Sequence, residues 1–280
     1  MAEANTVLVT GATGNVGRHV LSGLLERGVE VRALVRDPAT ARLPEGVEAV
    51  RGDLTRPETL EDAAAGVASV FLLWPGFGAA DAPAAVDAVA RHARRIVYLS
   101  ASAGPENRRP DGFWGEIEEL VERTGLEWTF LRAGGFAANT LGWADQIRDG
   151  VVRWPYGQAG RSLIHEADIA AVAVRALTED GHVGAAYTLT GPEVLTQVEQ
   201  VAVIGRAVGR DVRWEEQPVD EAREQLLAAW GDPSYADMAL AAWAAMVDDP
   251  ESVTTTVQDV TGTPARTFHQ WALDHAADFA

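Results

Sequence analysis

Apolar residues fall into short runs that alternate with amphipathic stretches along the first half of the chain. The runs are rich in valine, isoleucine and leucine, as in strands that are buried on both faces of a parallel sheet. The intervening stretches have helical periodicity, so the pattern predicts an α/β fold with a Rossmann-type, doubly wound parallel sheet. Strands are expected at residues 6–10, 30–35, 47–51, 69–74, 95–100 and 127–131.

The second half of the chain departs from this rhythm. Residues 133–161 are rich in glycine, tryptophan and turn residues, which predicts an excursion away from the sheet. Residues 162–190 are expected to return to it with a helix and a strand. We therefore predict a nucleotide-binding Rossmann domain over residues 1–132, while residues 133–280 form mostly a smaller α/β lobe that binds the substrate. Further helices are expected at residues 196–208 and 221–246, the latter broken at residues 231–233.

Composition and charge exclude several classes of function. A net charge of −18 argues against nucleic acid as a ligand, because neutralising phosphates needs a basic face. Cysteine is absent, which excludes disulfides and thiolate chemistry, and the histidines have no metal-ligand spacing. All 23 basic residues are arginine, so no lysine is available as a nucleophile or proton donor. Without an apolar span or signal peptide, we expect a cytoplasmic protein with no membrane partner.

A glycine-rich turn joins the first expected strand to the first expected helix, which the pattern places at about residues 14–27. Gly11 allows the chain to turn sharply, Gly14 lets a pyrophosphate approach the backbone, and Gly17 lets the helix pack closely on the strand. The free N–H groups and the positive dipole end of that helix then face the phosphates. The turn therefore predicts a dinucleotide site at the carboxyl edge of the sheet.

Several stretches resemble the NmrA-like family of atypical short-chain dehydrogenases/reductases. After Thr10 the glycines have the spacing G-x-x-G-x-x-G, and residues 31–38 read VRALVRDP. Residues 125–136 read GLEWTFLRAGGF, residues 164–170 read IHEADIA, and residues 187–192 read YTLTGP. The resemblance covers essentially the whole chain. It implies either an NAD(P)H-dependent reductase or a non-catalytic, NAD(P)-sensing regulatory or partner protein, as a monomer or homodimer.

The end of the second strand bears on the choice of nucleotide. Arg36 stands where an NAD-selective site places an acidic residue on the ribose, and an arginine suits a 2′-phosphate instead. We therefore expect NADP(H), with NAD(H) less favoured. Asp37, the next residue, is an alternative ligand for the ribose. The alternative interpretation of Arg36 is a solvated loop arginine. Asp53 matches the family's Gly-Asp-Leu, where the carboxylate accepts from the adenine amino group. The alternative interpretation of Asp53 is a helix cap just before Thr55. Thr55 itself is expected to cap the next helix, because Glu58 follows it with the spacing of a capping box. The cofactor-binding residues expected from the motifs and the resemblance are Thr10, Gly11, Thr13, Gly14, Asn15, Val16, Gly17, Arg36, Asp53, Leu54, Leu73, Trp74 and Ser100.

The usual acid of the superfamily, a tyrosine with a lysine four residues later, is absent; the matching helix start reads GFWGE at residues 112–116. The candidate catalytic residues are Ser100, Tyr156 and His165, although Ser100 equally suits a loop cap and His165 a packing role. Aromatic residues in strand-end loops form either a flat apolar substrate pocket or part of the core. The residues expected to contact a substrate are Trp74, Phe77, Ser102, Trp114, Phe136, Asn139 and Trp143.

Together these observations predict an NADPH-dependent oxidoreductase that transfers a hydride to a flat conjugated acceptor. A quinone, an enone or an aromatic polyketide-like molecule would suit. Such an acceptor needs little acid assistance because the developing charge is delocalised, which fits a site without the Tyr–Lys dyad.

Overall fold

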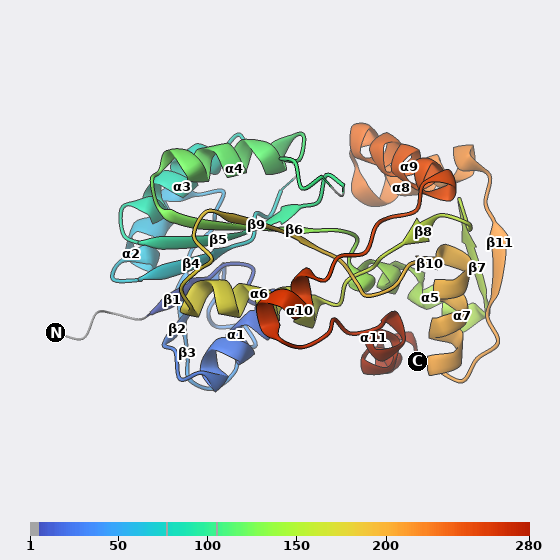
Figure 1. The fold of residues 1–280 in the computed structure, drawn as a ribbon, viewed down its shortest axis with the longest axis horizontal. Helices are drawn as coiled ribbons and strands as arrows, with labels where there is room; N and C mark the ends of the chain where they lie inside the picture. The colour runs from blue at the N-terminus through green and yellow to red at the C-terminus, as the bar shows by residue number, and fades with distance from the viewer. Residues whose placement is uncertain (1–5, 77, 105) are drawn as a thin grey trace. The chain divides into compact units, whose positions relative to one another are not determined.

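A seven-stranded parallel sheet forms the centre of the first of two units in the computed structural model (Figure 1). The structure describes residues 6–76, 78–104 and 106–280. The strand order is β3-β2-β1-β4-β5-β6-β9, which reverses between β1 and β4 and confirms the predicted doubly wound α/β fold. The strands are β1 (Val7–Val9), β2 (Val31–Val35), β3 (Val47–Arg51), β4 (Ser69–Leu72), β5 (Arg95–Ala101), β6 (Glu127–Ala133) and β9 (Ala185–Leu189).

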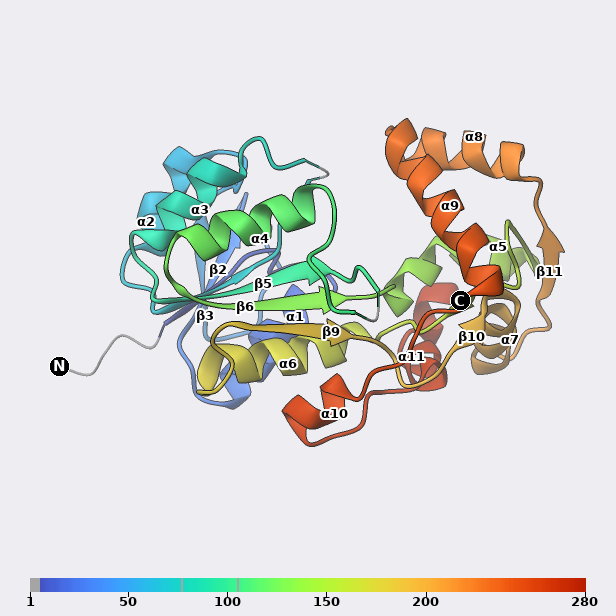
Figure 2. The ribbon, with the colours of Figure 1, turned by 45° about the horizontal axis from the view of Figure 1, so that its top comes forward.

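Helices cover both faces of this sheet (Figures 1 and 2). One face carries α2 (Leu60–Ala64), α3 (Ala82–Ala90) and α4 (Phe113–Arg123), and a 3₁₀ turn, η1 (Pro57–Thr59), precedes α2. The other face carries α1 (Gly17–Glu26) and α6 (Glu166–Thr178). Because of this double cover, all residues of β1 and β4 are buried. By contrast β3, at the edge of the sheet, has no fully buried residue.

The second unit contains Gly135–His165, Thr190–Thr255 and Ala265–Ala280. Its core includes Trp143, Ile204 and Trp271. Its strands are β7 (Val151–Trp154), β8 (Gly160–Arg161), β10 (Leu195–Thr196) and β11 (Arg213–Glu216). Its helices are η2 (Ala137–Trp143), α5 (Ala144–Asp149), α7 (Gln197–Ala207), α8 (Val219–Trp230), α9 (Pro233–Asp248), α11 (Phe268–Asp274) and η3 (Ala276–Phe279). No helix in the described part of the chain is both long and apolar enough to cross a membrane.

The predicted break between residues 221 and 246 is confirmed. Gly231 has a left-handed conformation that ends α8, and the Asp232 side chain then accepts from the Tyr235 amide to cap α9. Two other expectations differ from the structure. Helix α1 begins at Gly17 and not at residue 14, and the segment α10 (Thr256–Thr261) clusters with the first unit.

Candidate functional site

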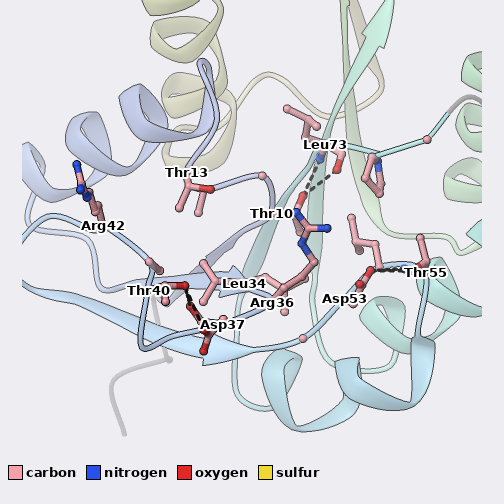
Figure 3. Close-up of a pocket in the computed structure, with 18 residues that line it drawn as sticks. Thr10, Thr13, Leu34, Arg36, Asp37, Thr40, Arg42, Asp53, Thr55 and Leu73 are labelled. Atoms are coloured by element: carbon pink, nitrogen blue, oxygen red, sulfur yellow. Dashed lines mark hydrogen bonds between the residues drawn. The ribbon is translucent and has the colours of Figure 1, made fainter. Parts of the chain in front are cut away.

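A cavity of about 910 Å³ lies at the carboxyl ends of β1, β2, β3 and β4 (Figure 3). Each wall is formed by the end of one of these strands or by the segment that follows it, so the sheet brings together residues that are far apart in the sequence. Because the strand order reverses between β1 and β4, this is the edge at which open α/β sheets bind ligands. The lining residues are Thr10, Gly11, Ala12, Thr13, Leu34, Val35, Arg36, Asp37, Thr40, Ala41, Arg42, Gly52, Asp53, Leu54, Thr55, Leu73, Pro75 and Gly76.

The glycine turn has the geometry that its sequence predicts. Gly11 has a φ of +61°, and a Cβ on Gly17 would overlap the Gly11 carbonyl oxygen, so α1 approaches the turn too closely for any other residue. A Cβ on Gly14 would have the same carbonyl as its sole neighbour, at 3.2 Å, so the outer side of Gly14 is open. The amides of Asn15 and Val16 donate to no other residue in the described ranges. Open backbone with available donors before a helix is what an anion needs.

Arg36 is an exposed residue of the cavity wall that forms no hydrogen bond or ion pair with any other described residue. Asp37, the alternative ribose ligand, already accepts hydrogen bonds from other residues of the protein. Its carboxylate accepts from the Thr40 hydroxyl at 3.1 Å (Figure 3). It also accepts from the Ala39 amide at 3.3 Å and from Arg51 at 3.3 Å. The cavity therefore presents an unpaired cation at the end of β2, beside an acid whose charge is balanced.

Asp53, which follows β3, has one carboxylate oxygen committed to the chain. Its Oδ1 accepts from the Thr55 amide at 3.0 Å and from the Thr55 hydroxyl at 2.9 Å. The amide hydrogen bond is the main cause that lowers the pKa of Asp53 below its ordinary value; burial opposes it, and the hydroxyl and Arg36 assist. The expected capping box between Thr55 and Glu58 is wrong, because Thr55 donates to Asp53 and no side chain caps the following 3₁₀ turn.

Thr10 ties the ends of β1 and β4 together behind the cavity. Its hydroxyl accepts from the Leu73 amide at 2.7 Å and donates to the Leu73 carbonyl at 3.3 Å (Figure 3). Two partners on one residue fix the separation of the strands at the point where their order reverses. This buried contact explains why a threonine ends the first strand.

Three of the residues expected in the first unit lie away from the cavity. Trp74 is 9% exposed, packs in the hydrophobic core, and donates from Nε1 to the Gly78 carbonyl at 2.8 Å. Ser100 is buried, and its hydroxyl donates to Glu118 at 2.7 Å. Ser102 is half-buried in the loop after β5, where its hydroxyl accepts from the Gly104 amide at 3.2 Å. Of these, only Ser102 retains an accessible side chain.

The other expected aromatic and polar residues are divided between the units. Trp114, on α4 in the first unit, is half-buried against Phe113 with ring centroids 4.1 Å apart. In the second unit, Phe136 is half-buried and Asn139 exposed. Trp143 is 5% exposed and belongs to the core of that unit, where it contacts Trp154 and Trp214 edge to face. Burial of Trp74 and Trp143 favours the core alternative for both residues. Phe77 lies outside the described residues.

The two remaining candidate acids, Tyr156 and His165, belong to the second unit. Tyr156 has a φ of +59°, and its amide donates to Glu216 at 2.5 Å. His165 is 3% exposed, and its Nε2 lies 3.3 Å from an Asp274 carboxylate oxygen. Neither lines the cavity, so their catalytic role stays a prediction.

Sequence reasoning missed the part of the wall formed by the loop after β2. Thr40 and Arg42 line the cavity, and Arg42 is an exposed arginine with no partner among the described residues. Figure 3 shows the guanidinium of Arg42 directed away from the cavity. Both residues follow the second expected strand, and this position could have identified them as part of the site. Among the described residues no cluster of acids and histidines has a metal-binding arrangement.

Comparison with known proteins gives consistent matches. The profile of a family described as NAD(P)H-binding matches residues 11–180. The chain is 41% identical to a (4-alkanoyl-5-oxo-2,5-dihydrofuran-3-yl)methyl phosphate reductase of Streptomyces griseus, over 98% of this chain and 99% of the relative. It is 38% identical to an NAD(P)H azoreductase of Xenophilus azovorans, with coverage of 98% and 99%. Among solved structures, an Escherichia coli NADPH-dependent quinone oxidoreductase complexed with NADPH matches with a TM-score of 0.80 at 25% identity, covering 95% of this chain and 98% of that chain.

Proposed function

Because the chain belongs to the NAD(P)H-binding, NmrA-like family of atypical short-chain dehydrogenases/reductases, we propose that it reduces a flat conjugated acceptor with NADPH. The observation that carries the choice of NADPH is the pairing pattern at the end of β2. Arg36 lines the cavity and forms no hydrogen bond or ion pair with a described residue, while Asp37 is held by Thr40, Ala39 and Arg51. A guanidinium at that position suits a 2′-phosphate, which NADH lacks.

The residues of the cavity, together with the adjoining part of the glycine turn, fit a dinucleotide. The open side of Gly14 and the available amides of Asn15 and Val16 suit the pyrophosphate. Asp53 keeps its Oδ2 oxygen to accept from an adenine amino group, and its lowered pKa keeps it ionised for that purpose. When bound, the reduced nicotinamide supplies the hydride, while the protein binds, orients and excludes water.

The class of acceptor follows from what the chain lacks and from its relatives. No tyrosine–lysine pair exists at the start of α4, so the usual proton donor of the superfamily is absent there. A quinone, an azo group and an unsaturated lactone, the groups in the names of the relatives, delocalise the charge that hydride addition creates. We infer that this chain also acts on such an acceptor, for which acid assistance matters little.

A panel assay tests this proposal. Purified protein is mixed with NADPH and, separately, with a naphthoquinone, an azo dye and an unsaturated lactone, and the absorbance of the reduced nicotinamide is followed. Consumption above the acceptor-free control with at least one of them is the expected result, with a higher kcat/KM for NADPH than for NADH. Tight NADPH binding without consumption in any mixture would instead favour a nucleotide-sensing protein.

A further inference from the structure

A buried ion pair lies beneath the carboxyl ends of β5 and β6. The Glu118 side chain on α4 is fully buried, and its two oxygens accept from Arg132 of β6, from Nη2 at 2.6 Å and from Nε at 3.0 Å. The Ser100 hydroxyl at the end of β5 donates to the same carboxylate at 2.7 Å. The attraction between two buried charges offsets the cost of their desolvation only when their geometry is good and further hydrogen bonds satisfy both groups. Glu118 is fully buried and the Arg132 side chain is only 8% exposed, so the pair has a structural role and is not a substrate contact.

Asn107 connects this pair to the loop between β5 and α4. Arg132 donates from Nη1 to the Asn107 backbone carbonyl and, at 3.2 Å, to its side-chain oxygen. The Asn107 amide group donates to the Ala186 carbonyl at 2.7 Å, and the Thr188 hydroxyl donates to the Asn107 oxygen at 3.0 Å. Asn107 has a φ of +49°, a left-handed conformation that asparagine tolerates better than most residues. One loop residue is therefore held to both β6 and β9.

The position of this loop relates it to the cavity. Strand β5 is the neighbour of β4, whose end forms one wall of the cavity. A dinucleotide lies across the edge at which the strand order reverses, with one half on each side. The cavity above β1, β2 and β3 holds the proposed ligands of the adenosine half, Arg36 and Asp53. The nicotinamide half would therefore extend over the ends of β4 and β5. The loop after β5, described at residues 102–104 and 106–112, begins at that place.

We propose that Asn107 is a positioning residue that fixes this loop beside the reactive half of the cofactor, with the Glu118–Arg132 pair as its anchor. The inference rests on the proposed reductase function. Ser102, whose amide donates to the Ala133 carbonyl at 2.8 Å, directly follows β5 and is the first residue of this loop. Asn107 acts on the reaction through the loop and contacts no reacting atom.

The test compares Asn107→Gly with Arg108→Ala in the full-length protein. Glycine accepts the left-handed backbone but loses every side-chain contact to Arg132, Ala186 and Thr188. Arg108 is a matched control on the same loop, since it is exposed and its ion pair with Asp111 is 3.5 Å long. Hydrogen exchange of the loop amides is measured with and without NADPH. The kcat and KM for the acceptor that the panel assay identifies, and the NADPH dissociation constant, are measured in parallel.

In the wild type and in Arg108→Ala, NADPH should slow exchange of the loop amides. In Asn107→Gly these amides should exchange faster and lose that protection. Its kcat should fall by about tenfold or more, because a displaced wall misorients the reactants, while the NADPH dissociation constant stays within about twofold.

Unchanged exchange in Asn107→Gly would overturn the proposal, as would faster exchange with wild-type kcat and KM. Absence of NADPH-dependent protection in the wild type would also overturn it. If the wild type reduces no acceptor, the reductase function fails, but the exchange measurements still decide whether Asn107 holds the loop at the cofactor.

Discussion

Replacing Arg36 with alanine should weaken NADPH binding selectively. The side chain forms no hydrogen bond or ion pair with a described residue, so its removal leaves no buried group unpaired and breaks no ion pair. A hydrogen bond to a charged group contributes about 1.5–3 kcal/mol, which corresponds to roughly a 10- to 150-fold change in the dissociation constant. Because Arg36 is exposed and screened by water, we expect the lower part of this range, and a smaller effect at high salt.

Titration of the nicotinamide fluorescence measures this effect with NADPH and NADH in parallel. The NADH dissociation constant should hardly change, since NADH has no 2′-phosphate. Arg56→Ala is the matched control: Arg56 is also exposed and follows Asp53 closely, but it does not line the cavity and pairs with Glu58. Equal losses for both nucleotides, or no loss for NADPH, would refute the role given to Arg36.

Three further substitutions test the structure around the site. Gly17→Ala should destabilise the fold by about 1–3 kcal/mol in urea unfolding, because its Cβ meets the Gly11 backbone, whereas Gly142→Ala, which meets nothing within 4 Å, should not. Glu118→Ala should lower the free energy of unfolding by about 3–5 kcal/mol, since it leaves a buried arginine unpaired; a loss below 1 kcal/mol would contradict the buried pair. The hydrogen bond from Thr55 lowers the pKa of Asp53 from 3.8, so ionised Asp53 stabilises the fold above that pH, and this contribution disappears as the pH falls through the folded-state pKa. The difference in unfolding free energy between wild type and Asp53→Asn should therefore shrink in acid, and curves that stay parallel would contradict the assignment.

The order of strands and helices was readable from the sequence because buried strands leave a strong pattern. Runs such as residues 70–72 are apolar on both faces, and the structure buries all of β4. The start of α1 was predicted too early because the turn from Gly11 to Gly17 resembles the beginning of a helix. In the structure the Gly14 amide bonds back to the Gly11 carbonyl at 2.9 Å, which closes a turn before the helix begins.

Cavity residues were predictable where a strand end alone decides their position. Thr10 and Arg36 each follow a strand directly, Asp53 is the second residue after β3, and all three line the cavity. Trp74 also follows a strand, but the turn after it buries the ring and bonds it to Gly78. The conformation of that turn depends on tertiary contacts that leave no local pattern.

Partners distant in sequence could not be inferred. Ser100 and Glu118 are 18 residues apart, and nothing in either neighbourhood indicates that the hydroxyl donates to that carboxylate. The partner of Thr55 also could not be inferred, although it lies only two residues away. Glu58 has the spacing of a capping box, yet the nearer carboxylate of Asp53 takes both donors of Thr55.

The most direct test of the proposed reductase is transfer of label from NADPH with deuterium at both C4 positions of the nicotinamide to an unsaturated lactone, analysed by mass spectrometry without oxygen. Our account predicts one deuterium on carbon in the reduced product for each NADPH oxidised, and much slower transfer from the correspondingly labelled NADH. Oxidation of NADPH without labelled product, or no reduction of any conjugated acceptor by protein that binds NADPH tightly, would contradict it.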